Sequence, residues 1–111
     1  MERAAVHALL AGLPGAEEYD HGGLPAFRVR GRRYASMLDA TGMNLMLDEA
    51  GAREATALWP DSCTVAWFGR MLTGVHVEFA AMADDDVAEL VEAAYRRKAP
   101  ATLRRELDER G

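Results

Sequence analysis

Arginine residues are the side chains whose type and spacing best suit chemistry with a ligand. Arg28, Arg30, Arg32 and Arg33 fall within six consecutive positions, and twelve of the thirteen basic residues of the chain are arginine. A guanidinium group keeps its charge and presents a planar fork of donors that matches phosphate oxygens. The run predicts a segment that binds a polyanion, and the competing interpretation is a charged turn exposed to solvent.

The charge of the chain is unevenly distributed. The formal net charge is -5, yet residues 28–33 carry +4 and residues 96–111 carry +3. An acidic chain is repelled by nucleic acid at long range, so any phosphate contact has to use these two basic segments. A composition that merely reflects a GC-rich genome is the alternative explanation for the many arginines.

The other polar side chains form no catalytic or metal-binding motif. Cys63 and His76 are near each other in the order of the chain. No third member of a catalytic group and no oxyanion motif accompanies them, so we expect no enzyme activity. The three histidines and Cys63 lack zinc-ligand spacing, so we expect neither a metal nor another cofactor. The carboxylates of residues 84–86 stand at the start of a predicted helix, where its dipole stabilises them.

The arginine run lies on a predicted β-hairpin. Phe27 and Val29 alternate with Arg28 and Arg30, which is the period-2 pattern of a half-buried strand. Gly31 allows a tight turn, and residues 34–38 form the returning strand. The hairpin would therefore present four arginines at and beside its turn.

The remaining segments predict a mixed fold. We expect further strands over residues 43–47, 64–68 and 75–79, and helices over residues 2–11, 49–58, 85–98 and 102–109. Residues 14–18 are expected to form a turn or a single helical turn. The clearest helix carries an apolar stripe of Val87, Leu90, Val91, Ala94 and Tyr95.

These elements predict one domain over residues 1–111. Consecutive strands with short links form an antiparallel sheet, and amphipathic helices must bury their stripes against one face of it. We therefore expect an α+β two-layer sandwich with an antiparallel sheet of about five strands and the terminal helices on one face. No apolar run approaches 18 residues, so no membrane segment is expected, and the single Cys63 fits a cytoplasmic location.

Three segments resemble the MmcQ/YjbR family: Leu13–Glu18 followed by His21, Pro25–Ala35, and Glu89–Tyr95, which is similar to the closing helix of that family. The order of elements agrees over nearly the whole chain. The resemblance implies a frataxin-like (CyaY-like) sandwich and DNA binding by a double wing of β-hairpin loops. The chain departs from the family pattern around residues 73–74, where a Trp commonly opens the last strand.

DNA binding is the leading functional hypothesis. Arg28, Arg30, Arg32 and Arg33 would form one wing, and Arg70 would lie in the second hairpin loop. Phosphate contacts would then supply most of the affinity and little sequence specificity. The hypothesis requires that these arginines share an exposed face and are not neutralised by the nearby carboxylates of Glu17, Glu18 and Asp20.

The alternative is a non-enzymatic protein that binds a small molecule or a metal in a groove between the sheet and the helices. Trp59, Trp67, Tyr34 and the methionines would line an apolar pocket. By analogy with the frataxin-like fold, the carboxylates of residues 84–86, 89 and 92 are the candidates for a hard cation.

Overall fold

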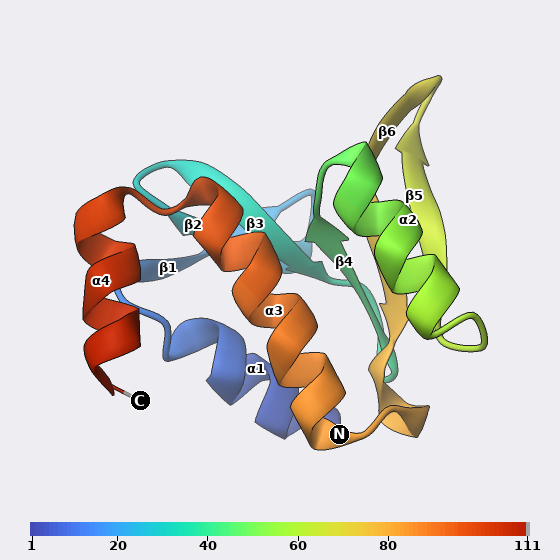
Figure 1. Ribbon diagram of the computed structural model, residues 1–111, viewed down its shortest axis with the longest axis horizontal. Coiled ribbons are helices and arrows are strands. Elements are labelled where there is room, and N and C mark those ends of the chain that lie inside the picture. The colour runs from blue at the N-terminus through green and yellow to red at the C-terminus, as the bar shows by residue number, and fades with distance from the viewer. Residues whose placement is uncertain (111) are drawn as a thin grey trace.

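The computed structural model describes residues 1–110, which form four α-helices, one 3-10 helix and six strands. In chain order they are α1 (Arg3–Ala11), β1 (Ala16–His21), β2 (Leu24–Val29), β3 (Arg32–Met37), β4 (Gly42–Met46), α2 (Glu49–Leu58), β5 (Cys63–Phe68), β6 (Met71–Glu78), η1 (Phe79–Ala81), α3 (Asp84–Lys98) and α4 (Ala101–Arg110). The strands form one antiparallel sheet in the order β1-β2-β3-β4-β6-β5. Figure 1 shows α2 and α3 lying across one face of it. The predicted α+β two-layer sandwich is confirmed.

The sheet has one strand more than expected. Residues 16–21 form the edge strand β1, so the turn predicted for residues 14–18 is wrong beyond Gly15. Both faces of β1 are largely exposed, and its sequence therefore lacks the apolar alternation that marks a half-buried strand. The pair Gly22-Gly23, with positive φ at both residues, is the signal of a two-residue hairpin turn that could have revealed it.

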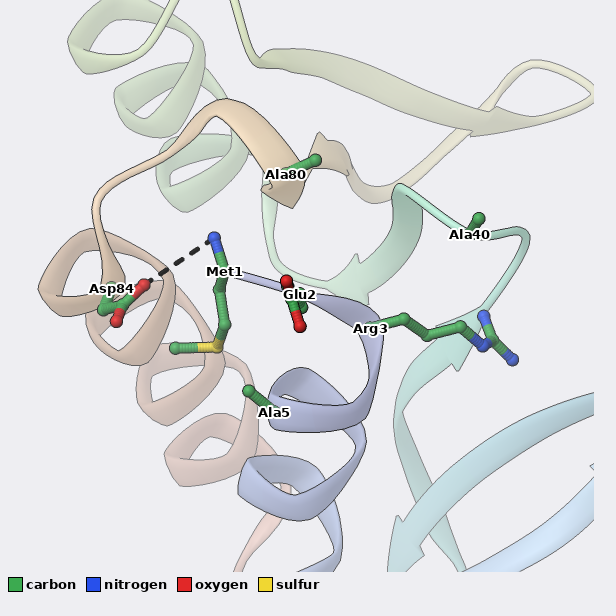
Figure 2. Close-up of a pocket in the computed structure, with 7 residues that line it drawn as sticks. All are labelled: Met1, Glu2, Arg3, Ala5, Ala40, Ala80 and Asp84. Carbon is green, nitrogen blue, oxygen red and sulfur yellow. Dashed lines mark ion pairs between the residues drawn. The ribbon is translucent and has the colours of Figure 1, made fainter.

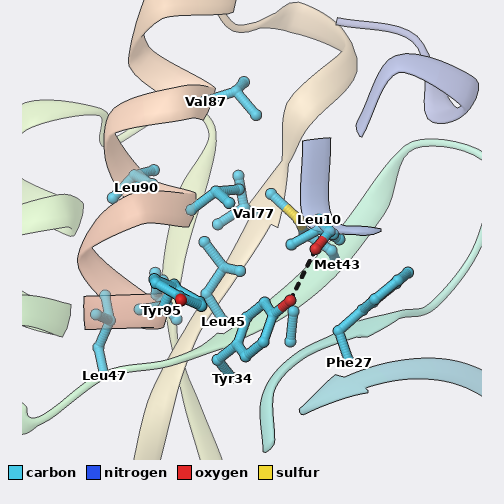
Figure 3. Packing of buried hydrophobic residues seen from close by; sticks show 14 of the residues in the cluster. Leu10, Phe27, Tyr34, Met43, Leu45, Leu47, Val77, Val87, Leu90 and Tyr95 are labelled. Carbon is cyan, nitrogen blue, oxygen red and sulfur yellow. Dashed lines mark hydrogen bonds between the residues drawn. The ribbon is translucent and has the colours of Figure 1, made fainter. Parts of the chain in front are cut away.

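One face of the sheet carries the core. The register places Phe27, Ala35, Leu45, Val75 and Val65 in one row across five strands on this face. The stripe of α3 packs against it, and Figure 3 shows side chains of this helix directed toward those of β4 and β6. All five residues of the predicted stripe are buried, which confirms the expected packing of this helix.

An irregularity in the β2–β3 pairing places Tyr34 in the core. Phe27 pairs with Ala35 and Arg28 with Arg33, so Tyr34 is the extra residue of a bulge. Its hydroxyl donates a hydrogen bond to the Leu10 carbonyl oxygen at 2.7 Å, and its burial raises the pKa of that hydroxyl (Figure 3). Tyr34 is therefore a structural core residue and does not line a ligand pocket between the sheet and the helices.

The opposite face of the sheet is polar at its centre. The neighbouring row contains Ala26, Ser36, Asn44, His76 and Thr64. The helices within residues 1–110 contribute their apolar side chains to the core on the first face. We call this second face the open face.

Candidate functional site

Arg30 lies in the two-residue turn between β2 and β3. This turn consists of Arg30 and Gly31, with φ of 50° and 76°, and two consecutive positive φ values are typical of a type I′ hairpin turn. Arg30 and Arg32 are both exposed, and Arg32 donates a hydrogen bond to the Lys98 carbonyl oxygen at 3.4 Å. The predicted hairpin is therefore present, and its turn lies against the C-terminal end of α3.

The fold joins the two basic segments of the sequence. Lys98 is half-buried, and its pKa is lowered first by that burial and then by the charges of Arg97, Arg32 and Arg33. Arg30 occupies the turn that the hydrogen bond of Arg32 holds against the end of α3, and its charge opposes the burial-driven rise in the pKa of Tyr95. We call Arg30, Arg32, Arg33, Arg97 and Lys98 the basic cluster.

The basic cluster has no carboxylate partner within residues 1–110. Seven ion pairs occur in this part of the chain, and none of them includes a member of the cluster. Side chains of like charge that gather without counter-charges repel one another. The charges of the cluster are therefore not neutralised by carboxylates of the described residues.

Arg28 does not belong to this cluster. It forms an ion pair with Glu17 of β1, and its guanidinium carbon lies 4.3 Å from the centroid of the Tyr19 ring. The other two carboxylates that could have neutralised the hairpin do not do so. Glu18 pairs with His7 at 2.7 Å, and Asp20 accepts a hydrogen bond from the Gly23 amide.

Arg70 lies in the turn that joins β5 to β6. The strand register places this turn and the β2–β3 turn at the same end of the sheet, toward its two opposite edges. Arg70 is exposed and belongs to none of the ion pairs within residues 1–110. Four of the five predicted arginines thus lack a carboxylate partner there, and Arg28 is the exception.

The open face is hollowed into a cavity of about 520 Å³, which we call the open-face groove. Its lining comes from all six strands and from the residue after β3: His21, Leu24, Arg33, Ser36, Leu38, Asn44, Met46, Trp67, Phe68 and Thr73. Arg33 donates a hydrogen bond to the Ser36 hydroxyl at 3.2 Å, which holds its guanidinium over the face. Trp67 is 56% exposed and Phe68 is 77% exposed.

Sequence reasoning missed this groove because it placed the pocket on the helical side. The cavity between α2 and α3, beside Trp59 and Leu90, measures only about 90 Å³. Pockets for small molecules usually measure about 300–1,000 Å³. Trp67 lies on the open face instead, and the signal that could have located it is the exposed pair Trp67-Phe68 directly before the turn at Gly69.

A second sizeable cavity, of about 470 Å³, lies beside the start of α1 and α3 (Figure 2). The Met1 amine lies 3.6 Å from the Asp84 carboxylate and donates to the Phe79 carbonyl oxygen at 3.0 Å. Arg3 donates to the Asp39 carbonyl oxygen at 2.5 Å. Because its cationic groups already have acceptors, this cavity offers weaker anchors for a ligand than the open-face groove.

No three His, Cys, Asp or Glu side chains are grouped to hold a metal ion within residues 1–110. Cys63 is buried, and that burial raises the pKa of its thiol, which disfavours a nucleophilic thiolate. Over the same residues, every helix is too short or too polar to cross a membrane.

The YjbR family model matches residues 11–97 of the sequence. The chain belongs to the YjbR family. The YjbR match contains the β2–β3 hairpin, the whole open-face groove and most of α3. No curated protein matches the sequence.

The crystal structure of Deinococcus radiodurans protein DR2400, a DUF419 domain, resembles this YjbR-family chain in its fold. The two share 18% sequence identity with a TM-score of 0.72, over 95% of this chain and 86% of the other. At this identity the likeness shows the fold alone.

Proposed function

We propose that this protein binds DNA through phosphate contacts made by the basic cluster. The observation that carries the proposal is the convergence of two basic segments on one surface, where Arg32 contacts a residue 66 positions away in the sequence. None of the five residues of the basic cluster has a carboxylate partner in residues 1–110. A phosphate group would relieve their mutual repulsion.

The geometry favours phosphate contacts over base reading. Exposed arginines on a hairpin turn reach a phosphate from solvent, and a guanidinium binds two of its oxygens at once. Arg70, at the same end of the sheet, would supply a further contact from the β5–β6 turn. Arg28 has a smaller share because Glu17 already accepts its hydrogen bond. The affinity would then be strongly salt-dependent and nearly independent of DNA sequence.

A DNA titration at two salt concentrations tests the proposal. The variant is the double substitution Arg30→Ala/Arg32→Ala. The matched control is Arg3→Ala/Arg53→Ala, which removes the same charge from α1 and α2, away from the cluster. We expect the cluster variant to weaken binding equally across DNA sequences and to reduce the slope of log K against log salt by about two, or about one per lost contact.

The control variant should bind almost as tightly as the wild type. Equal losses in the two double variants would mean that only the net charge matters. Wild-type affinity and slope in the cluster variant would remove the hairpin from the binding surface. Either result overturns the proposal.

A further inference from the structure

We propose that the open-face groove binds the unpaired bases of single-stranded nucleic acid, with Trp67 as the stacking platform. The inference rests on the proposed function, because the basic cluster would hold the phosphates of the same strand. It goes further by naming a second surface and by selecting single strands over duplexes.

The shape of the sheet produces the groove. Its lining joins two diagonally opposite corners, with His21 and Leu24 beside the β1–β2 turn and Trp67 and Phe68 beside the β5–β6 turn. A twisted sheet raises diagonally opposite corners toward the same side, which leaves a concave surface between them. The register shift between Ala66 and Trp67 strengthens the local bend of β5. The cavity volume of about 520 Å³ is within the usual range for pockets that bind small organic groups.

The charge of the groove selects an anionic ligand. The chain contains 18 acidic residues, yet none of the ten lining residues is acidic, and the one permanently charged residue among them is Arg33. Arg33 belongs to both surfaces, because it follows Arg32 in β3 and its guanidinium lies over the groove, where it donates to the Ser36 hydroxyl. A strand whose phosphates contact the cluster would have its next bases beside the groove.

The aromatic side chains supply the interaction with bases. The described chain exposes five large apolar side chains, and three of them, Trp67, Phe68 and Met71, lie at the end of the β5–β6 hairpin. Bases of every type stack on aromatic rings, so such a platform tolerates different sequences. Stacking requires a free base face, which the interior of a duplex does not offer.

Polar groups on the floor of the groove would meet the base edges. The Asn44 side-chain amide lines the groove, and its Oδ1 lies 3.2 Å from His76 Nδ1. The buried Ser36 hydroxyl accepts from Arg33 and retains its own proton for donation. A base that enters the groove would therefore find donors below it and an aromatic ring beside it.

The test compares three ligands of equal length: a single-stranded oligo-dT of about ten nucleotides, an abasic strand with the same phosphates, and a blunt duplex. The variant is Trp67→Ala. The matched control is Leu58→Ala, which removes a side chain of similar exposure, 57%, from α2 on the helical side. We expect Trp67→Ala to weaken oligo-dT binding about tenfold and to leave binding of the abasic strand unchanged. Leu58→Ala should change neither.

A second measurement keeps Trp67 in place. In a Trp59→Phe background Trp67 is the single tryptophan, and its fluorescence should be quenched by oligo-dT but not by the abasic strand. Unchanged oligo-dT affinity in Trp67→Ala, or equal quenching by both strands, overturns the inference. So does a dimer that Trp67→Ala converts to a monomer without loss of strand binding, because the groove would then join two copies.

The two proposals fail separately. If Arg30→Ala/Arg32→Ala weakens binding and Trp67→Ala does not, the phosphate surface stands and the groove is not a base site. If Arg30→Ala/Arg32→Ala leaves binding of all three ligands unchanged, the proposed function fails, and the inference that depends on it fails as well.

Discussion

Replacing Arg30 with asparagine should stabilise the protein while it weakens DNA binding. Arg30 occupies the first position of the β2–β3 turn with φ of 50°, a backbone conformation that residues other than Gly, Asn and Asp rarely adopt. Its side chain is exposed and forms no ion pair within residues 1–110. Arginine is thus unfavourable for the backbone conformation of this turn, but its exposed guanidinium is well placed to contact an anion.

The expected gain follows from the backbone alone. The left-handed conformation costs an ordinary L-residue about 1–2 kcal/mol, and asparagine avoids part of this cost because its short side chain hydrogen-bonds locally. Nothing offsets the gain, since the substitution removes no ion pair or buried surface. We expect Arg30→Asn to raise the free energy of unfolding by about 0.5–1 kcal/mol, which corresponds to an increase in Tm of about 2–6 °C.

Urea unfolding and thermal melts of three proteins provide the assay. Arg30→Ala is the matched control, because it removes the same charge but keeps a residue unsuited to positive φ. It should therefore lack the stability gain of Arg30→Asn, while both variants lose the same phosphate contact and lower the salt slope of DNA binding by about one. Equal stability of the two variants would refute the argument from backbone strain.

Three further predictions concern the fold. Leu90→Ala should lower the free energy of unfolding by about 2–5 kcal/mol in urea titrations, because Leu90 is only 4% exposed, and a loss below 1 kcal/mol would contradict the packing of α3. Gly74→Ala should cost about 3 kcal/mol or more, because the new Cβ would lie 1.9 Å from the Leu45 carbonyl oxygen, and a wild-type melt would disprove this close approach. Amide donors in its own turn lower the pKa of Asp39, so its contribution to stability is complete above about pH 4 and is lost as pH falls through the lower folded-state pKa. Unfolding measured between pH 2 and pH 6 should show a weaker acid dependence in Asp39→Asn, and identical profiles would exclude this contribution.

The sequence by itself determined the fold class and most of the elements. Apolar side chains in the stripe of α3 and in β2 repeat with the period of the structure they form, because each element buries one face against a single core. The helix expected over residues 49–58 is present as α2, and the Asp48 carboxylate caps its start by accepting from the Gly51 amide. Local sequence rules did not predict edge strand β1, because an exposed strand has no buried face to mark its period.

Tertiary structure alone decided the composition of the candidate site. Sequence distance does not reveal that Arg32 lies against Lys98, or that Glu17 pairs with Arg28 while Glu18 pairs with His7. Those partners depend on strand register and on the helix that covers each strand. The position of Trp67 is a further case, because the face on which its ring lies follows from the twist of the whole sheet and a local register shift. Long-range register and twist are properties of the assembled sheet, and no local pattern of residues encodes them.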